Sequence, residues 1–190
     1  MPALALTFDD GPDAACTPRL LDMLGDAGAR ATFFPIAPRA QAHPELVARM
    51  LAEGHTVGLH CDEHVRHTER DLEWGRRDTE RALARLRRLG AEPALWRTPW
   101  GSTAGWTEQV AAEYGLRLVG WNVDTHDWRG DRARAMFAAT RAGLSPGAVV
   151  LAHDGLGPGA LRLGSAETLA FVEIVIGHAE REGLTLDAIR

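Results

Sequence analysis

Two adjacent carboxylates and two histidines four residues apart are the groups in this sequence best suited to hydrolytic chemistry. Asp9 and Asp10 directly follow an apolar run, so their side chains point in different directions if that run is a strand. One carboxylate can then bind a metal ion while its neighbour transfers a proton. His60 and His64 face the same way if their segment forms a helical turn. Together with Asp10 they form a set that leaves positions for water and substrate, as catalytic zinc sites require.

Each of these features also has a purely structural explanation. An Asp-Gly-Pro sequence is typical of a turn, and a bare His-x3-His pair is more often a surface feature than a metal site. Cys61 is an alternative ligand because thiolates bind soft metal ions, and His67 offers another imidazole nearby. The metal site is therefore a hypothesis, which requires that the fold bring these side chains together.

Three further residues could assist the same chemistry. Arg97 precedes a Thr-Pro-Trp-Gly segment, so it is either a positioned cation or a structural ion pair at a strand end. Asp127 and His153 could form a buried structural pair, or a proton donor oriented by a carboxylate. We expect capping, turn or surface roles for the remaining histidines, which are His43, His55, His126 and His178.

Polar clusters follow five of the runs that we predict to be strands. In parallel α/β folds the C-terminal ends of the strands meet at one rim, where active sites are built. Five clusters on the same rim are hard to attribute to chance, which favours a functional explanation. The clusters cover residues 7–12, 60–64, 97–101, 124–128 and 151–154.

Short apolar runs alternate with amphipathic segments along the chain. The strands are predicted at residues 3–8, 31–34, 56–59, 94–97, 116–119, 148–151 and 184–186. The helices are predicted at residues 17–27, 44–53, 72–89, 107–114, 132–142 and 166–182. Because parallel strands need helical crossovers, this order predicts an α/β fold. We expect a small, incomplete barrel of about seven parallel strands, with a doubly wound open sheet as the competing architecture.

Length and composition indicate a single globular domain. The chain has 190 residues, a net charge of -5 and a pI near 5.9, which argues against nucleic-acid binding. The arginines between residues 66 and 97 alternate with acidic residues, which predicts an ion-paired helix surface. No apolar run approaches the ~20 residues of a membrane span, and the two cysteines form no disulfide framework. The N-terminus lacks the features of a secretory signal, so we expect a cytoplasmic protein.

Taken in order, these motifs resemble the polysaccharide deacetylase family, also called NodB-like or carbohydrate esterase family four. The Thr-Phe-Asp-Asp-Gly-Pro opening at residues 7–12 is specific, and the other four blocks follow in the family's order as far as His153 and the final helix. The resemblance implies a distorted (β/α) barrel and one catalytic domain over residues 1–190. It also implies metal-dependent removal of N-acetyl or O-acetyl groups from an N-acetylated amino sugar, with release of acetate.

The same resemblance implies a base and a metal site. Asp9 would be the general base, and Arg97 would pair with it and keep it ionised. One divalent ion would be bound, with zinc as the default and cobalt, nickel or manganese also compatible with the donor set. The implied metal ligands are Asp10, His60 and His64.

The resemblance also implies a general acid and a substrate pocket, whose residues lie in the later motif clusters. His153 would be the general acid, and Asp127 would orient it. The backbone N–H of Trp100 would stabilise the oxyanion. Trp128 and Leu151 would form the wall around the acetyl methyl group.

Three positions depart from the family pattern without removing a catalytic group. Cys61 replaces the usual Ser or Thr, Val65 the common Pro, and Trp100 the usual Tyr. Two alternative functions remain open. One is a deformylase or other amidohydrolase that acts on a small or lipid-linked sugar. The other is a non-catalytic sugar-binding protein, although the presence of all three metal-ligand candidates argues against it.

Overall fold

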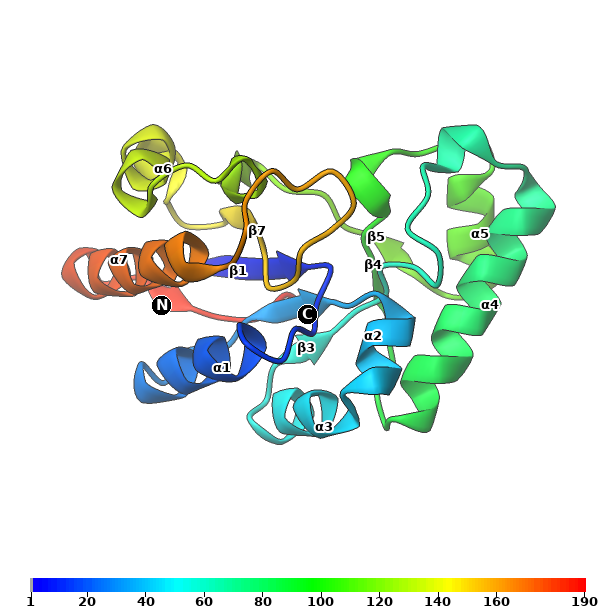
Figure 1. Cartoon of the computed structure of the whole chain (residues 1–190), viewed down its shortest axis with the longest axis horizontal. Coiled ribbons are helices and arrows are strands. Elements are labelled where there is room, and N and C mark those ends of the chain that lie inside the picture. Colours follow the sequence, from blue (N-terminus) through cyan, green and yellow to red (C-terminus); the bar gives the residue numbers. More distant parts are fainter. Residues whose placement is uncertain (1) are drawn as a thin grey trace.

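Parallel strands form the centre of the molecule in the computed structural model, which describes residues 2–190 (Figure 1). The main sheet has the order β3-β2-β1-β7-β6, and β8 also pairs with β1. A second sheet consists of β4 and β5. The strands are β1 Ala3–Asp9, β2 Thr32–Phe34, β3 Thr56–Val57, β4 Leu95–Trp96, β5 Arg117–Leu118, β6 Val123–Asp124, β7 Val149–His153 and β8 Thr185–Leu186.

The two sheets are linked by a bridge between Leu59, just beyond β3, and Trp96 in β4. The strands therefore follow one another from β6 through β7, β1, β2 and β3 to β4 and β5. Within residues 2–190 no pairing joins β5 to β6, so the ladder stays open there. Each strand pair is parallel, which confirms the predicted α/β fold.

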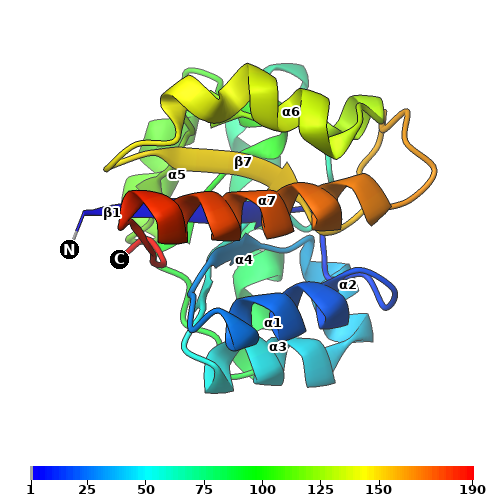
Figure 2. The same ribbon diagram turned by 90° about the vertical axis from the view of Figure 1, so that its left-hand side faces the viewer.

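Helices lie around the outside of the strands (Figure 1, Figure 2). Figure 2 shows α7 in front of β1, between α6 on one side and α1 on the other. The helices α4 and α5 pack together beside β4 and β5 (Figure 1). The helices are α1 Thr17–Asp26, α2 Ala37–Ala42, α3 Pro44–Ala52, α4 Leu72–Arg88, α5 Thr107–Glu113, α6 Ala133–Thr140 and α7 Ala166–Glu182. Of these, none in the described part of the chain is long and apolar enough to cross a membrane.

The core lies between the central strands and the helices that cover them. Phe8 of β1 and Val150 of β7 are fully buried, and they belong to the same hydrophobic cluster as Phe171 and Val175 of α7. Burial of side chains of this size contributes about 1.5–3 kcal/mol each. The central strands are therefore held rigidly, and so are the residues at their C-terminal ends.

Most predicted elements are found with bounds shifted by one or two residues. The helix predicted over 166–182 has those same bounds, because its apolar face is continuous. The predicted ion-paired surface is also confirmed, since Arg76 pairs with Glu113 and Arg81 with Glu63. One α-helix and one strand were not predicted. They are α2, which has only six residues, and β6, whose two residues are defined by pairing with β7.

Candidate active site

The C-terminal ends of β1 and β7 bring two of the candidate residues side by side. Asp9 is the last residue of β1, His153 is the last residue of β7, and the two are partners in the strand register. Asp10 follows with a positive φ of 71°, a conformation that non-glycine residues adopt rarely and mostly at functional sites. This turn at the end of β1 sends the carboxylates of Asp9 and Asp10 to different partners.

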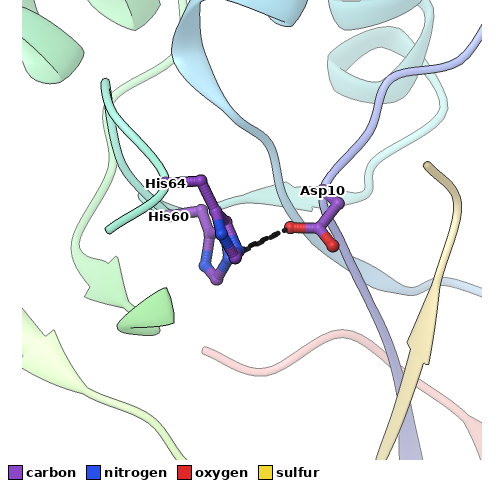
Figure 3. A group of neighbouring side chains, drawn as sticks. All are labelled: Asp10, His60 and His64. Carbon is purple, nitrogen blue, oxygen red and sulfur yellow. Dashed lines mark ion pairs between the residues drawn. The ribbon is translucent and has the colours of Figure 1, made fainter. Parts of the chain in front are cut away.

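Asp10, His60 and His64 form a compact group of potential metal ligands (Figure 3). Oδ1 of Asp10 lies 3.3 Å from Nε2 of His60 and 3.1 Å from Nε2 of His64. This oxygen is buried and has no hydrogen-bond partner, so the three donor atoms converge without satisfying one another. Such a set of two imidazoles and one carboxylate fits a divalent transition metal ion.

The surroundings of these three residues also favour metal binding. Nδ1 of His60 donates a hydrogen bond to the carbonyl of Arg97 over 2.7 Å, which leaves Nε2 as the free donor atom. Burial alone would raise the pKa of the Asp10 carboxyl, but the two histidines hold that pKa well below its usual range. Asp10 is therefore a carboxylate, the form that binds cations.

The segment 60–64 is not helical, so the prediction that a helical turn aligns its two histidines is wrong. The loop is instead held by the buried carboxylate of Asp78 in α4. This carboxylate accepts hydrogen bonds from the backbone N–H groups of Asp62 at 3.0 Å and Glu63 at 2.7 Å. Two charge-assisted hydrogen bonds thus impose the loop conformation that turns both imidazoles towards Asp10.

Both alternative ligands lie outside the group. Cys61 is buried, and burial raises the pKa of its thiol well above the ordinary value, which disfavours the thiolate that metals bind. Nδ1 of His67 lies 3.0 Å from the hydroxyl of Thr107, and its ring stacks on Trp106. Burial lowers the pKa of His67 to about 4, so it is a neutral residue of an aromatic cluster.

Asp9 is held by a buried arginine, as expected. Nη1 of Arg97 donates to Oδ1 of Asp9 at 2.9 Å and to the hydroxyl of Thr7 at 2.6 Å. Nη2 of the same arginine donates to the carbonyl of Gly120. The guanidinium is thus fixed on several sides, and it both orients Asp9 and balances its charge.

His153 and Asp127 form a second coupled pair. Nδ1 of His153 lies 2.6 Å from Oδ1 of Asp127, whose Oδ2 accepts the hydroxyl of Thr168 at 2.8 Å. Burial alone would lower the pKa of His153, but the hydrogen bond and charge of Asp127 outweigh it and raise this pKa to about 9. His153 is therefore an imidazolium at neutral pH, with Nε2 left to carry a transferable proton.

Arg162 is a buried part of the site that sequence reasoning missed. Its Nη1 lies 3.1 Å from Oδ2 of Asp127, and its Nη2 donates to the carbonyls of His153 and Gly155 at 2.9 and 3.0 Å. It therefore ties the loop after β7 to the acid pair. Its position in the Gly-rich segment before α7 gave no periodic signal that could have identified it.

These residues surround a cavity of about 420 Å³. Trp128 and Leu151 line it, as the resemblance implied, and Trp100, Trp121 and Asp124 also belong to its lining. Trp100 has a positive φ of 54°, another strained position that persists only where the surroundings impose it. A cavity with aromatic walls, a potential metal site, a carboxylate and an imidazolium can bind a sugar and hydrolyse an acyl group on it.

Known proteins share both the sequence and the fold of this chain. The model of the family described as polysaccharide deacetylase matches residues 1–119. A peptidoglycan-N-acetylglucosamine deacetylase of Listeria monocytogenes is 38% identical over 154 residues, covering 80% of this chain but only 32% of that protein. The chain thus spans about a third of the length of that relative. A chitooligosaccharide deacetylase of Sinorhizobium fredii is 38% identical over 167 residues, covering 83% of this chain and 74% of that one.

A solved structure agrees with these matches. It is a family 4 carbohydrate esterase from Streptomyces lividans in complex with acetate, with a TM-score of 0.87 and 31% identity. The similarity covers 97% of this chain and 91% of that one. The shared fold therefore extends well beyond residues 1–119, to the strand and loop that carry His153.

Proposed function

Since this chain belongs to the polysaccharide deacetylase family, we propose that it is a metal-dependent hydrolase that removes N-acetyl groups from an amino sugar and releases acetate. One observation carries the proposal. Asp9 and His153 are register partners at the ends of β1 and β7, next to the convergent donors of Asp10, His60 and His64. A base, an acid and a potential metal site thus share one cavity.

Amide hydrolysis has to overcome a weakly electrophilic carbonyl and a poor leaving group. When bound by Asp10, His60 and His64, a divalent ion supplies polarisation of the acetyl carbonyl and a lowered pKa for water. Zinc suits two imidazoles and one carboxylate, and cobalt, nickel and manganese are compatible with the same donors.

Asp9 accepts the proton of the attacking water in this proposal. Its ion pair with Arg97 keeps the carboxylate charged and fixes its orientation before substrate arrives. The backbone N–H of Trp100 stabilises the oxyanion that develops on the acetyl group, and such preorganised donors are often the largest single contribution to catalysis. Trp128 and Leu151 surround the acetyl methyl group and exclude water from it.

His153 donates a proton from Nε2 to the departing nitrogen. The amine cannot leave as an anion, so the C–N bond breaks only as that proton arrives. Asp127 makes this possible at neutral pH, because it keeps His153 protonated up to about pH 9. The products are acetate and a free amino sugar.

Acetate release tests this proposal directly. The substrates are chitooligosaccharides, peptidoglycan fragments and small N-acetylglucosamine conjugates, together with N-formyl analogues that would reveal a deformylase. We expect acetate from the N-acetyl sugars, loss of activity with a chelator and recovery with added zinc. Turnover that survives chelation, or release of formate alone, would contradict the proposal. Asp9→Asn controls for a contaminating hydrolase, since it should be inactive.

A further inference from the structure

Two tryptophans on the wall of the cavity each carry an arginine on the indole face. Cζ of Arg66 lies 4.4 Å from the ring centroid of Trp100, and Cζ of Arg129 lies 5.2 Å from that of Trp128. The ring centroid of Trp100 is 4.2 Å from that of His64, which places this pair on the side of the metal-ligand group. Trp128 adjoins Asp127 and so lies on the side of the acid. The two guanidinium groups therefore flank the reacting centre.

Both guanidinium groups are available to a ligand. Arg66 and Arg129 are exposed, and within residues 2–190 neither side chain forms a salt bridge or a hydrogen bond. Stacking on an indole holds a guanidinium in place while its in-plane N–H groups stay free. Those N–H groups match the two oxygens of a carboxylate, which a guanidinium binds with two parallel hydrogen bonds.

The charged groups of the reacting centre are already paired with one another. Asp9 pairs with Arg97, and Asp10 lies beside His60 and His64. His153 and Arg162 both pair with Asp127. In the described part of the chain the guanidinium groups of Arg66 and Arg129 have no such partner, so they are the cations left to bind an anionic group of the substrate outside the reacting centre.

From this arrangement, and resting on the proposed deacetylase function, we infer that Arg66 and Arg129 bind carboxylates on the sugar units that flank the reacting N-acetyl sugar. The preferred substrate is then an acidic glycan rather than a neutral one. Cations on both sides of the reacting centre favour an anion that repeats along the chain over a single terminal phosphate.

Four probes distinguish these possibilities. The acidic probe is a tetrasaccharide in which N-acetylglucosamine alternates with its 3-O-lactyl derivative. Its methyl ester has the same shape without the charge, chitotetraose is neutral, and N-acetylglucosamine 1-phosphate offers a terminal anion. Binding is measured by quenching of tryptophan fluorescence, because Trp100 and Trp128 lie at the proposed subsites. We expect the acid to bind roughly tenfold more tightly than its ester at low salt, with the ratio falling as salt is added.

Four variants show which residues cause the preference for the acid over its ester. Arg66→Gln and Arg129→Gln should each lower the acid-to-ester ratio by about threefold, and together they should abolish it. Arg70→Gln is the matched control, because Cζ of Arg70 lies 5.7 Å from the ring of Trp74, a pair outside the cavity lining. That variant should leave the ratio unchanged.

The inference is overturned by equal binding of acid and ester, by a ratio that survives in the double variant, or by tighter binding of the 1-phosphate than of the acid. Acetate release is recorded separately for the same probes. If no probe releases acetate, the proposed function fails, while the binding ratios still decide whether Arg66 and Arg129 select carboxylates.

Discussion

Nδ1 of His153 lies 2.6 Å from Oδ1 of Asp127, and the backbone N–H of the same histidine donates to Oδ2 of that carboxylate at 3.1 Å. Two hydrogen bonds between the same two residues fix both the ring and the backbone of His153. The ring can therefore offer only Nε2 to a substrate. The same contact favours the charged imidazolium, so the orientation of the proposed acid and its protonation depend on one carboxylate.

Replacing Asp127 should shift the alkaline side of the pH profile. His153 has to be protonated to act as an acid, and its pKa of about 9 keeps it so in the unaltered protein. In Asp127→Asn the stabilising charge is gone while burial still disfavours the imidazolium, so the pKa should fall to about 6.5 or lower. The pH dependence of kcat should show the alkaline limb moving to lower pH, with metal content unchanged as the control. An unmoved limb would leave Asp127 with only a structural role.

Asp9 and Asp10 should differ in metal binding despite being neighbours. Asp10→Asn removes a convergent oxygen donor, so bound zinc should be lost. Asp9→Asn keeps the three donors and removes the proposed base, so zinc should remain while turnover disappears. Metal content after dialysis, measured by mass spectrometry, separates the two cases. Identical metal content in the two variants would show that this division of roles is wrong.

Replacing Arg162 should move the alkaline limb of the pH profile in the opposite direction to replacing Asp127. Arg162→Gln removes a positive charge 3.1 Å from Asp127, so the imidazolium of His153 should be favoured further and the alkaline limb should move to higher pH. Breaking a buried ion pair should also destabilise the fold by about 3 kcal/mol. Urea unfolding and the kcat profile measure the two effects. If both match the unaltered protein, Arg162 neither positions the pair nor stabilises its loop.

The sequence predicts those parts of the site that depend on strand ends. Asp9 and His153 each end an apolar run, and parallel strands place such residues on one rim, so their proximity follows from the pattern. The helix over residues 166–182 can be predicted equally well, because its apolar periodicity is continuous. In both cases the information is local, and the fold only has to bring the ends together.

Features set by distant contacts could not be predicted in this way. The loop 60–64 is shaped by Asp78, a residue of α4 whose carboxylate replaces the backbone partners that a helical turn would have had. Arg162 is similar, since its partners Asp127 and His153 lie 35 and nine positions earlier in the chain. Neither residue shows a spacing that identifies its role, because that role arises only once the chain has folded.

Gly157 lies so close to Asp10 that there is no room for a side chain at this position. A Cβ atom at Gly157 would lie 1.9 Å from Oδ2 and 2.7 Å from Cγ of Asp10, closer than non-bonded atoms can approach. Asp10 cannot rotate away without withdrawing Oδ1 from the two imidazoles. Gly157→Ala should therefore weaken zinc binding roughly tenfold, the lower end of the effect of disturbing groups that support metal ligands.

Gly164→Ala is the matched control in the same segment between β7 and α7. A Cβ atom there has no atom within 4 Å, so zinc affinity should not change. Competition with a chromogenic chelator gives the affinities, and thermal unfolding without metal shows whether either variant disturbs the fold. The expected result is weaker zinc binding in Gly157→Ala alone, with both melting temperatures near that of the unaltered protein. Equal affinities would mean that the loop yields to the added methyl group, and that Gly157 does not hold the Asp10 carboxylate against the imidazoles.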